Sequence, residues 1–320
     1  QKRRKMASGT HATFLWDKSA EIDGKRASVE TKSVTVCSGM QWHKVKYYLW
    51  THEQNKNAAG KERTIICWHG LARNAHDYDY IAQHLVKEIP NARVIAVDSP
   101  GRGESENLLN PQLYNLQTYA IIAMNILTQL GNPEEIEWIG TSMGGLLGML
   151  LSAASVNCPI KRLALVDVGP FISKSAVERI ASYVGKDPSY ASLEEAEKYF
   201  RSVYTQMGTL SDEQWTHMTR YLTKPKEDGT VGLHYDPAIA LSFKGTEIKE
   251  IDLWALWGLV KSTRIFLMHG AKSDVLTLDT VQKMQNEGPK VEKLVTFDDC
   301  GHTPHLFSEP MCRELLDWLH

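Results

Sequence analysis

The chain has 320 residues, of which 42% are hydrophobic and 23% charged, the balance of an ordinary soluble globular protein. Its formal net charge of -2 excludes a strong general attraction to nucleic acid or to anionic membranes. Its apolar runs are interrupted or too short to form a membrane-spanning helix. We therefore expect a monomer or homodimer with a small-molecule partner, and neither a nucleic-acid nor a membrane partner.

The cysteines and the N-terminus indicate the cellular compartment of the protein. Five scattered cysteines, with no C-x-x-C pair among them, predict reduced thiols and a cytoplasmic protein. The basic run Gln1 to Lys5 lacks a following apolar stretch, so it does not resemble a secretory signal. We expect residues 1–30 to form an N-terminal extension without fixed structure.

Strand-like and helix-like patterns alternate along most of the chain. Ser33 to Cys37 and Val45 to Trp50 alternate in the strand period and predict a hairpin. Further strands are expected at 64–68, 94–97, 137–139, 162–166, 264–268 and 293–297, and helices at 77–87, 116–130, 146–151, 281–285 and 309–319. Such alternation predicts an α/β fold with a mostly parallel, eight-stranded sheet and helices on both faces.

Residues 171–259 interrupt this alternation. They contain several amphipathic helical patterns but no clear strand pattern, and two capping boxes begin at Ser192 and Ser211. We expect a helical cap inserted between two parts of one core, 31–170 and 260–320. Large side chains are frequent in the cap, and a few of them should line a pocket above the sheet.

The segment Gly140-Thr141-Ser142-Met143-Gly144 is expected to be a tight strand-to-helix turn. The glycines two residues before and after Ser142 remove bulk where the backbone must pass closely. The serine hydroxyl would then be exposed at a helix N-terminus, where developing negative charge is favoured. Because a glycine-rich turn alone is weak evidence for a nucleophile, the chain must also supply a base, an acid and an oxyanion donor.

The candidate base is His302, on the loop after the last predicted strand. The acid that orients it is expected to be Asp274, on the loop after strand 264–268. Asp167, after strand 162–166, is the rival, and its expected role is structural, in the turn that follows it. Asp298 and Asp299 lie too near His302 in sequence to be first choices.

The expected oxyanion donors are backbone N–H groups. One belongs to Met143, directly after the nucleophile, and the other to Leu71, on the loop after strand 64–68. Arg73 and Arg102 are candidates for binding a substrate carboxylate, and Trp215 is a candidate contact from the cap. The alternative for each arginine is a structural ion pair.

Other chemistries find little support. Gly101-Arg102-Gly103 lacks the rest of a dinucleotide-binding fingerprint, and no phosphate-binding glycine-rich loop occurs. His302 and His305 are separated by a proline and lack a nearby cluster of further metal ligands. We expect neither a metal nor a cofactor.

Taken together, these motifs resemble the α/β-hydrolase superfamily from about Val34 to the C-terminus. The motifs are His69 to Leu71, Asp98 to Ser105, Gly140 to Gly145, Ser273-Asp274 and Gly301-His302. The strings Asp167 to Pro170 and His234 to Ala240 resemble bacterial esterase-like members with a helical cap. The resemblance implies an acyl-serine intermediate at Ser142 that water, activated through His302, releases without a cofactor.

The leading functional hypothesis is a serine hydrolase that cleaves carboxylic esters of small or medium acyl groups. The alternatives on the same residues are opening of a lactone, hydrolysis of a thioester, and cleavage of a carbon–carbon bond beside a carbonyl. A ligand-binding protein of receptor type, with little turnover, is the alternative from another class. A serine at position 142 disfavours the relatives that use an aspartate nucleophile.

Overall fold

The computed structural model describes residues 21–22, 25–53, 60–154, 157–243, 247–261 and 263–320. Residues 1–20 of the predicted N-terminal extension lie outside the described residues. Residues 23–24 also lie outside them. Residues 21–22 and 25–30 contribute to the main sheet, because β1 (Glu21–Ile22) pairs with the start of β2 (Lys25–Ser38). The prediction of an extension without fixed structure is therefore wrong for residues 21–22 and 25–30.

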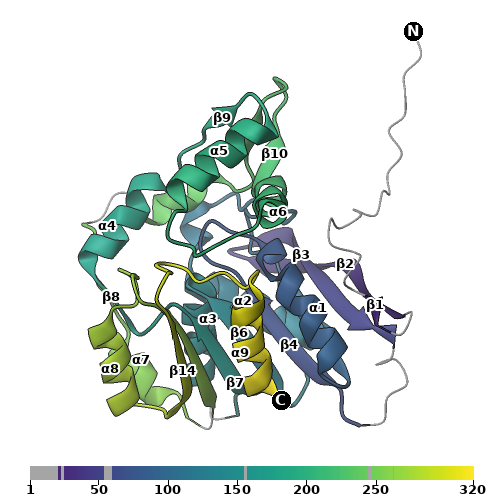
Figure 1. The fold of residues 1–320 in the computed structure, drawn as a ribbon, viewed down its shortest axis with the longest axis vertical. Coiled ribbons are helices and arrows are strands. Elements are labelled where there is room, and N and C mark those ends of the chain that lie inside the picture. Colours follow the sequence, from purple (N-terminus) through teal and green to yellow (C-terminus); the bar gives the residue numbers. More distant parts are fainter. Residues whose placement is uncertain (1–20, 23–24, 54–59, 155–156, 244–246, 262) are drawn as a thin grey trace.

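One twisted sheet organises the molecule (Figure 1). Within the described residues it has nine strands in the order β1-β2-β3-β5-β4-β6-β7-β13-β14, one more than predicted because of β1. The strands from β5 to β14 run parallel, while β2 and β3 are antiparallel to their neighbours. The remaining strands are β3 (Gln41–His52), β4 (Arg63–Trp68), β5 (Ala92–Val97), β6 (Ile136–Thr141), β7 (Ile160–Val166), β13 (Arg264–Gly270) and β14 (Val291–Phe297). The predicted α/β fold is confirmed.

The predicted hairpin is formed by β2 and β3, with Val34 opposite Val45. Its two-residue turn is Gly39-Met40, and both residues have positive φ angles, 56° and 64°. This geometry matches the right-handed twist of the strands that it joins.

Helices cover both faces of the sheet. In β4, Ile65 and Cys67 face one layer while Ile66 and Trp68 face the other, as the two-residue period of a strand requires. The first layer contains α1 (Asp79–Glu88) and α9 (Glu309–Leu319). The second contains α2 (Leu116–Gln129), α3 (Met143–Ala154), α7 (Trp254–Leu259) and α8 (Leu278–Asn286). The 3-10 helices are η3 (Ala75–Tyr78), η4 (Pro111–Leu113) and η5 (Pro237–Phe243).

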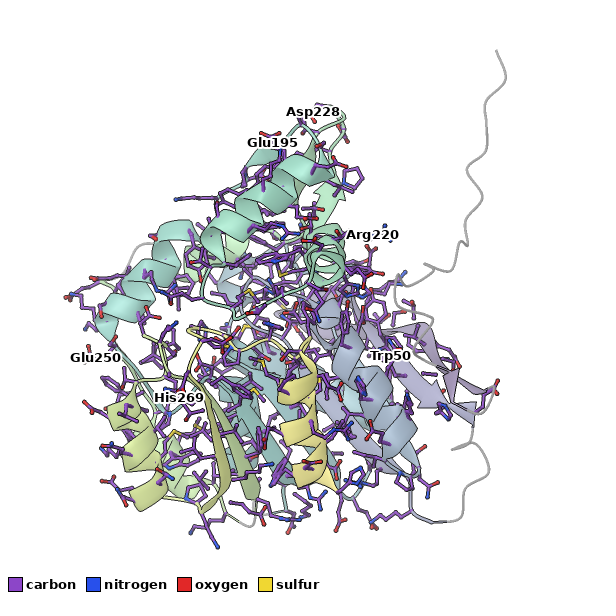
Figure 2. The ribbon with its side chains drawn as sticks, in the orientation of Figure 1. Trp50, Glu195, Arg220, Asp228, Glu250 and His269 are labelled. Carbon is purple, nitrogen blue, oxygen red and sulfur yellow. The ribbon has the colours of Figure 1, made fainter. Side chains whose placement is uncertain are left out.

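Most of the predicted cap segment lies above the carboxyl ends of the parallel strands, in green in Figure 1, but its last helix, α7, packs beside the sheet in the core, so the predicted boundary at residue 259 is wrong. The helices above the strands are α4 (Lys174–Tyr183), α5 (Leu193–Val203) and α6 (Asp212–Leu222). In Figure 2, Glu195, Arg220 and Asp228 label this upper part, whereas Trp50 and His269 belong to the core below it. The capping box at Ser211 is confirmed, with both reciprocal hydrogen bonds to Gln214. At the other predicted box, the Ser192 side chain caps α5 by accepting the Glu195 N–H. The Glu195 carboxylate accepts the N–H of Ala191 and not that of Ser192, so this hydrogen bond differs from that of a capping box.

The expectation of a purely helical cap is wrong. The segment also contains β8 (Phe171–Ile172), β9 (Ser189–Tyr190), β10 (Thr223–Pro225), β11 (Val231–Leu233) and β12 (Ile251–Asp252). β9, β10 and β11 form a small antiparallel sheet. β8 pairs with β12, so the segment leaves the core and returns to it through adjacent strands.

Two further findings concern the sequence as a whole. All five cysteines lie within the described residues as free thiols, as predicted, and four of them are buried. Among the described helices, none is long and apolar enough to span a membrane.

Candidate active site

Ser142 occupies the predicted strand-to-helix turn, between β6 and α3. Its φ angle is 49°, a left-handed conformation that is uncommon for a residue with a side chain. The flanking glycines are required by close packing. A Cβ at Gly140 would lie 2.3 Å from the Gly144 carbonyl oxygen, and one at Gly144 would lie 1.8 Å from that of Trp68. The turn therefore forms only with glycine at both positions, and it presents Ser142 beyond the end of the sheet.

Ser142 and His302 are hydrogen-bonded, although 160 positions separate them in the chain. The distance between Ser142 Oγ and His302 Nε2 is 3.1 Å. The other ring nitrogen of His302, Nδ1, lies 2.7 Å from Asp167 Oδ2. With Nδ1 protonated and donating to the carboxylate, Nε2 is free to accept the serine proton. The three side chains form the nucleophile, base and acid geometry of acyl-transfer enzymes.

Asp167 is held rigidly in this position. Its side chain is fully buried, and its φ angle is 53°. The N–H of Gly270 donates to Oδ1 over 2.8 Å, and the hydroxyl of Ser273 donates to Oδ2 over 2.6 Å. Both donors come from the end of β13 and the loop after it, next to β7 in the sheet. These hydrogen bonds fix the orientation of the carboxylate and aim it at His302.

The expectation that Asp274 orients His302 is therefore corrected. Asp274 turns away from the base and forms a bidentate ion pair with Arg179 of α4, in which Arg179 Nη2 lies 2.8 Å from Oδ1. Its side chain is 48% exposed. β7 and β13 are parallel neighbours, so the loops after them begin at the same edge of the sheet. Either loop could therefore carry the aspartate that orients His302. In this chain the β13 loop contributes Ser273, which supports Asp167.

The turn after β4 lies against the nucleophile. A Cβ at Gly70 would lie 3.7 Å from the Cβ of Ser142, so the Gly70-Leu71 peptide borders the Ser142 side chain. Burial lowers the pKa of His69 to about 3, which keeps its ring neutral. His69 Nε2 accepts the N–H of Ser99 over 2.9 Å, and Nδ1 donates to the Gly70 carbonyl over 2.6 Å. Because a peptide is planar, this contact also fixes the direction of the Leu71 N–H.

Arg102 holds the same turn from its other side. The guanidinium is fully buried, and its Nε donates to the Leu71 carbonyl over 2.8 Å. Its Nη1 donates to the Pro100 carbonyl and to the Tyr119 hydroxyl, each over 2.7 Å. The suggestion that Arg102 contacts substrate is therefore wrong, because its side chain lies inside the core.

The other two candidate contacts also have structural partners. Arg73 forms a bidentate ion pair with Asp77, at 2.8 Å and 2.6 Å, as its alternative interpretation predicted. Trp215 packs in the apolar core of the cap, with the guanidinium of Arg201 5.2 Å from its ring. Neither residue contributes to the wall of the large cavity beside His302.

That cavity has a volume of about 650 Å³ and lies between the cap and the core. His302 forms part of its wall, so a molecule bound there can contact the His302 side chain. The other described lining residues come mostly from the cap: Ala72, Arg179, Tyr183, Lys186, Pro188, Tyr199, Phe200, Val203, Tyr204, Thr205, Gln206, Met207, Leu222, Leu233, Tyr235, Lys272 and Asp274. The wall combines aromatic and apolar surface with a few charged groups, as expected of a site for a small organic molecule.

Sequence reasoning missed the supporting residues of this site. In the sequence, His69 and Ser273 stand out only as parts of motifs, and no pattern singles out Tyr78. The Tyr78 hydroxyl bonds both to the Trp68 carbonyl at 2.6 Å and to Thr141 Oγ1 at 2.9 Å, joining the ends of β4 and β6. Polar residues directly after predicted buried strands are the signal that identifies such supports, since burial obliges them to find partners.

The fold and the site geometry define a class of enzyme. The family model of the alpha/beta hydrolase fold matches residues 63–309. The chain belongs to the α/β-hydrolase family, and the arrangement of Ser142, His302 and Asp167 is that of a hydrolase of this family.

Particular relatives agree with this assignment. The chain is 34% identical over 270 residues to the 3-hydroxybutyrate-oligomer hydrolase of Cupriavidus necator, covering 82% of this chain and 88% of the relative. A solved structure assigned to a hydrolase of Rickettsia typhi has a TM-score of 0.80 and 32% identity, covering 91% of this chain and 98% of that one. An α/β hydrolase from Novosphingobium aromaticivorans has a TM-score of 0.77 and 28% identity, with 90% and 98% covered.

Proposed function

We propose that this protein is a serine hydrolase that cleaves carboxylic esters, with Ser142 as nucleophile, His302 as general base and Asp167 as the orienting carboxylate. The observation that carries the proposal is the continuous hydrogen-bonded series from Ser142 through His302 to the buried Asp167. Its members lie at the carboxyl ends of strands in one sheet, where α/β hydrolases perform their chemistry.

The first half of the reaction forms an acyl-enzyme. Ser142 Oγ attacks the ester carbonyl carbon while its proton passes to His302 Nε2. The carbonyl oxygen becomes an oxyanion, for which the backbone N–H groups of Leu71 and Met143 are the proposed donors. When the carbon–oxygen bond breaks, His302 gives the proton to the departing alcohol. Asp167 stabilises the imidazolium that forms between these two proton transfers.

The second half releases the acid. Water attacks the acyl carbon, and His302 accepts one of its protons. Collapse of the second tetrahedral intermediate breaks the bond to Ser142 Oγ, which regains a proton from His302. The acid product then leaves, and the enzyme returns to its starting state.

For the substrate, we propose short esters of hydroxy acids. This proposal is supported by the activity for which the Cupriavidus necator relative is named, since the alignment covers most of both chains. A cavity of about 650 Å³ is within the range that accommodates small ligands. Lining groups such as Phe200, Met207 and Leu233 offer apolar surface to a short aliphatic chain.

Comparison of the wild type with Ser142→Ala tests the mechanism. The substrates are p-nitrophenyl esters of increasing acyl length and the linear dimer of 3-hydroxybutyrate. We expect turnover of both kinds by the wild type and a loss of at least about 10³-fold in the variant, since the acyl-enzyme cannot form. Ser152→Ala removes a hydroxyl from α3 and serves as the matched control, with turnover retained.

Two outcomes would contradict the proposal. Turnover that survives Ser142→Ala would show that the nucleophile lies elsewhere. A folded wild type that cleaves none of these esters would redirect the assignment to lactones, thioesters or carbon–carbon bonds, or to a receptor without turnover.

A further inference from the structure

The wall of the large cavity carries an excess of positive charge. Among its described lining residues, the ionised groups are Arg179, Lys186 and Lys272 against the carboxylate of Asp274. Because His302 lines the same cavity, these charges lie in the space from which a substrate reaches the base. A concave, partly apolar surface strengthens the field of such charges relative to open water.

One of the cations is already neutralised. Arg179 on α4 and Asp274 on the β13 loop form the bidentate ion pair described above, with side chains 43% and 48% exposed. The pair links the cap to the core at the wall of the cavity. Asp274 thus compensates the arginine and leaves the charges of the two lysines uncompensated.

Lys272 is anchored beside the catalytic group. Its backbone N–H donates to the Cys300 carbonyl over 2.8 Å, two residues before His302. The next residue, Ser273, donates to Asp167. The backbone of Lys272 is therefore held by the two loops that carry the proposed base and support the proposed acid, while its side chain lines the cavity.

Lys186 approaches from the cap. The Tyr235 hydroxyl donates to the Lys186 carbonyl over 3.1 Å and accepts the Gly185 N–H over 3.3 Å, which fixes the turn after α4. The adjacent Asp187 pairs instead with Lys226 at 2.9 Å. Within the described part of the chain, neither Lys186 nor Lys272 has a carboxylate at ion-pair distance.

We propose that the cavity selects esters that carry a free carboxylate, with Lys186 and Lys272 as the groups that bind it. This inference rests on the proposed function and adds the charge of the substrate to it. A linear ester of hydroxy acids has one carboxylate end, which can meet the lysines while the rest of the molecule occupies the cavity that His302 lines. The lysines act as specificity determinants, because an ammonium group favours an anion over a neutral isostere.

A matched pair of substrates tests the charge alone. The linear dimer of 3-hydroxybutyrate is compared with its terminal carboxamide, which has nearly the same size but no charge. For the wild type we expect kcat/KM to favour the acid by about tenfold, mainly through KM. In the Lys186→Gln/Lys272→Gln double variant the preference should fall close to one. Lys198→Gln removes the same charge from an exposed position of α5 outside the cavity, and should keep the wild-type preference.

Asp274→Asn gives a change of opposite sign. Without its carboxylate partner, Arg179 becomes available to the substrate, so preference for the acid should rise by a few-fold. Added salt should reduce the preference in the wild type, because exposed charges are screened within about 10 Å at 0.1 M ionic strength.

The outcomes separate this inference from the function on which it rests. Equal use of acid and amide by the wild type, or a preference that persists in the double variant, overturns the carboxylate site. If neither dimer is cleaved, inhibition of p-nitrophenyl acetate hydrolysis by 3-hydroxybutyrate becomes the readout. If 3-hydroxybutyrate inhibits the wild type no more strongly than the double variant, the carboxylate site is also overturned. Loss of p-nitrophenyl acetate hydrolysis in Ser142→Ala would still support the serine hydrolase.

Discussion

Asp167 is the carboxylate whose loss should affect catalysis most. Asp167→Asn keeps the size of the side chain but removes the charge that fixes the His302 tautomer and stabilises its protonated form. We expect kcat for p-nitrophenyl acetate to fall by about 10⁴-fold. Asp274→Asn, at the exposed ion pair with Arg179, should reduce it by less than about tenfold.

The two variants control for each other, because both replace an aspartate by asparagine and the two aspartates lie on neighbouring loops. Circular dichroism and thermal unfolding establish that both proteins are folded. If Asp274→Asn proves the more damaging of the two, the assignment of the acid from the structure is wrong.

At the scale of single residues, the sequence predicts the role of a side chain when the pattern that identifies it lies in the neighbouring residues. Ser142 is recognisable because its two glycines are required by its own turn, and His302 because it lies on the loop that follows the last strand. The acid is different, since Asp167 and Asp274 both follow strands that end at the same edge. Their distinction depends on Gly270 and Ser273, which reach Asp167 across the boundary between β7 and β13. The spacing of residues within either loop does not predict a contact of this kind between the two loops.

Side-chain direction explains the failed substrate contacts. Arg73 and Arg102 do lie on loops near the site, as predicted, but their guanidinium groups turn toward Asp77 and Tyr119. A long flexible side chain has many rotamers, and the one selected depends on partners that only the folded chain assembles.

At the scale of elements, the turn after β4 should affect the catalytic rate, because it positions the N–H of Leu71. His69→Ala removes the shorter of two hydrogen bonds to the Gly70 carbonyl, leaving the one from the Arg73 N–H at 3.2 Å, so the direction of the Leu71 N–H is held less firmly. We expect kcat to fall by about 10- to 100-fold with little change in KM, since an oxyanion donor acts mainly in the transition state.

The control is His43→Ala, which empties a similarly buried histidine site on β3. Both variants should be less stable than the wild type, but His43→Ala should keep its kcat. Equal losses of kcat would mean that the effect of His69 is merely structural.

Elements were predicted best where they are long and strongly periodic. Helix 309–319 agrees with α9 at both ends, and the predicted buried strands correspond to β4, β5, β6, β7, β13 and β14. The cap strands have two or three residues each, too few for an alternating pattern to emerge. They exist because cap segments far apart in sequence pair with one another, which is a tertiary effect.

Across the whole molecule, a buried charged cluster joins the cap to the core. Asp79 of α1 accepts His76 Nδ1 at 2.7 Å and lies 3.3 Å from His217 Nε2 of cap helix α6. The His76 ring stacks on Tyr221, also from α6, with centroids 3.6 Å apart. Burial opposes protonation of His76, but the nearby carboxylates of Asp79, Asp98 and Asp77 together raise its pKa above the ordinary value.

This raised pKa makes stability dependent on pH. In the unfolded chain the pKa of a histidine is about 6.5, so the stabilising contribution of His76 is complete below that pH. It is lost as pH rises through the higher pKa of the folded protein. The wild type should therefore exceed His76→Gln in free energy of unfolding most strongly near pH 6, and the difference should shrink toward pH 9. Urea unfolding at several pH values measures it, and a difference that grows with pH would contradict the assignment.

The point at which the cap is inserted divides the proposed triad along the chain. Ser142 and Asp167 both precede β8, whereas His302 follows β14, close to the C-terminus. During synthesis, the nascent chain therefore carries its nucleophile and its acid through the whole length of the cap before the base has been added. The complete triad can form only after β14 has joined β13 at the edge of the sheet, so the proposed chemistry becomes possible only after the cap has been synthesised.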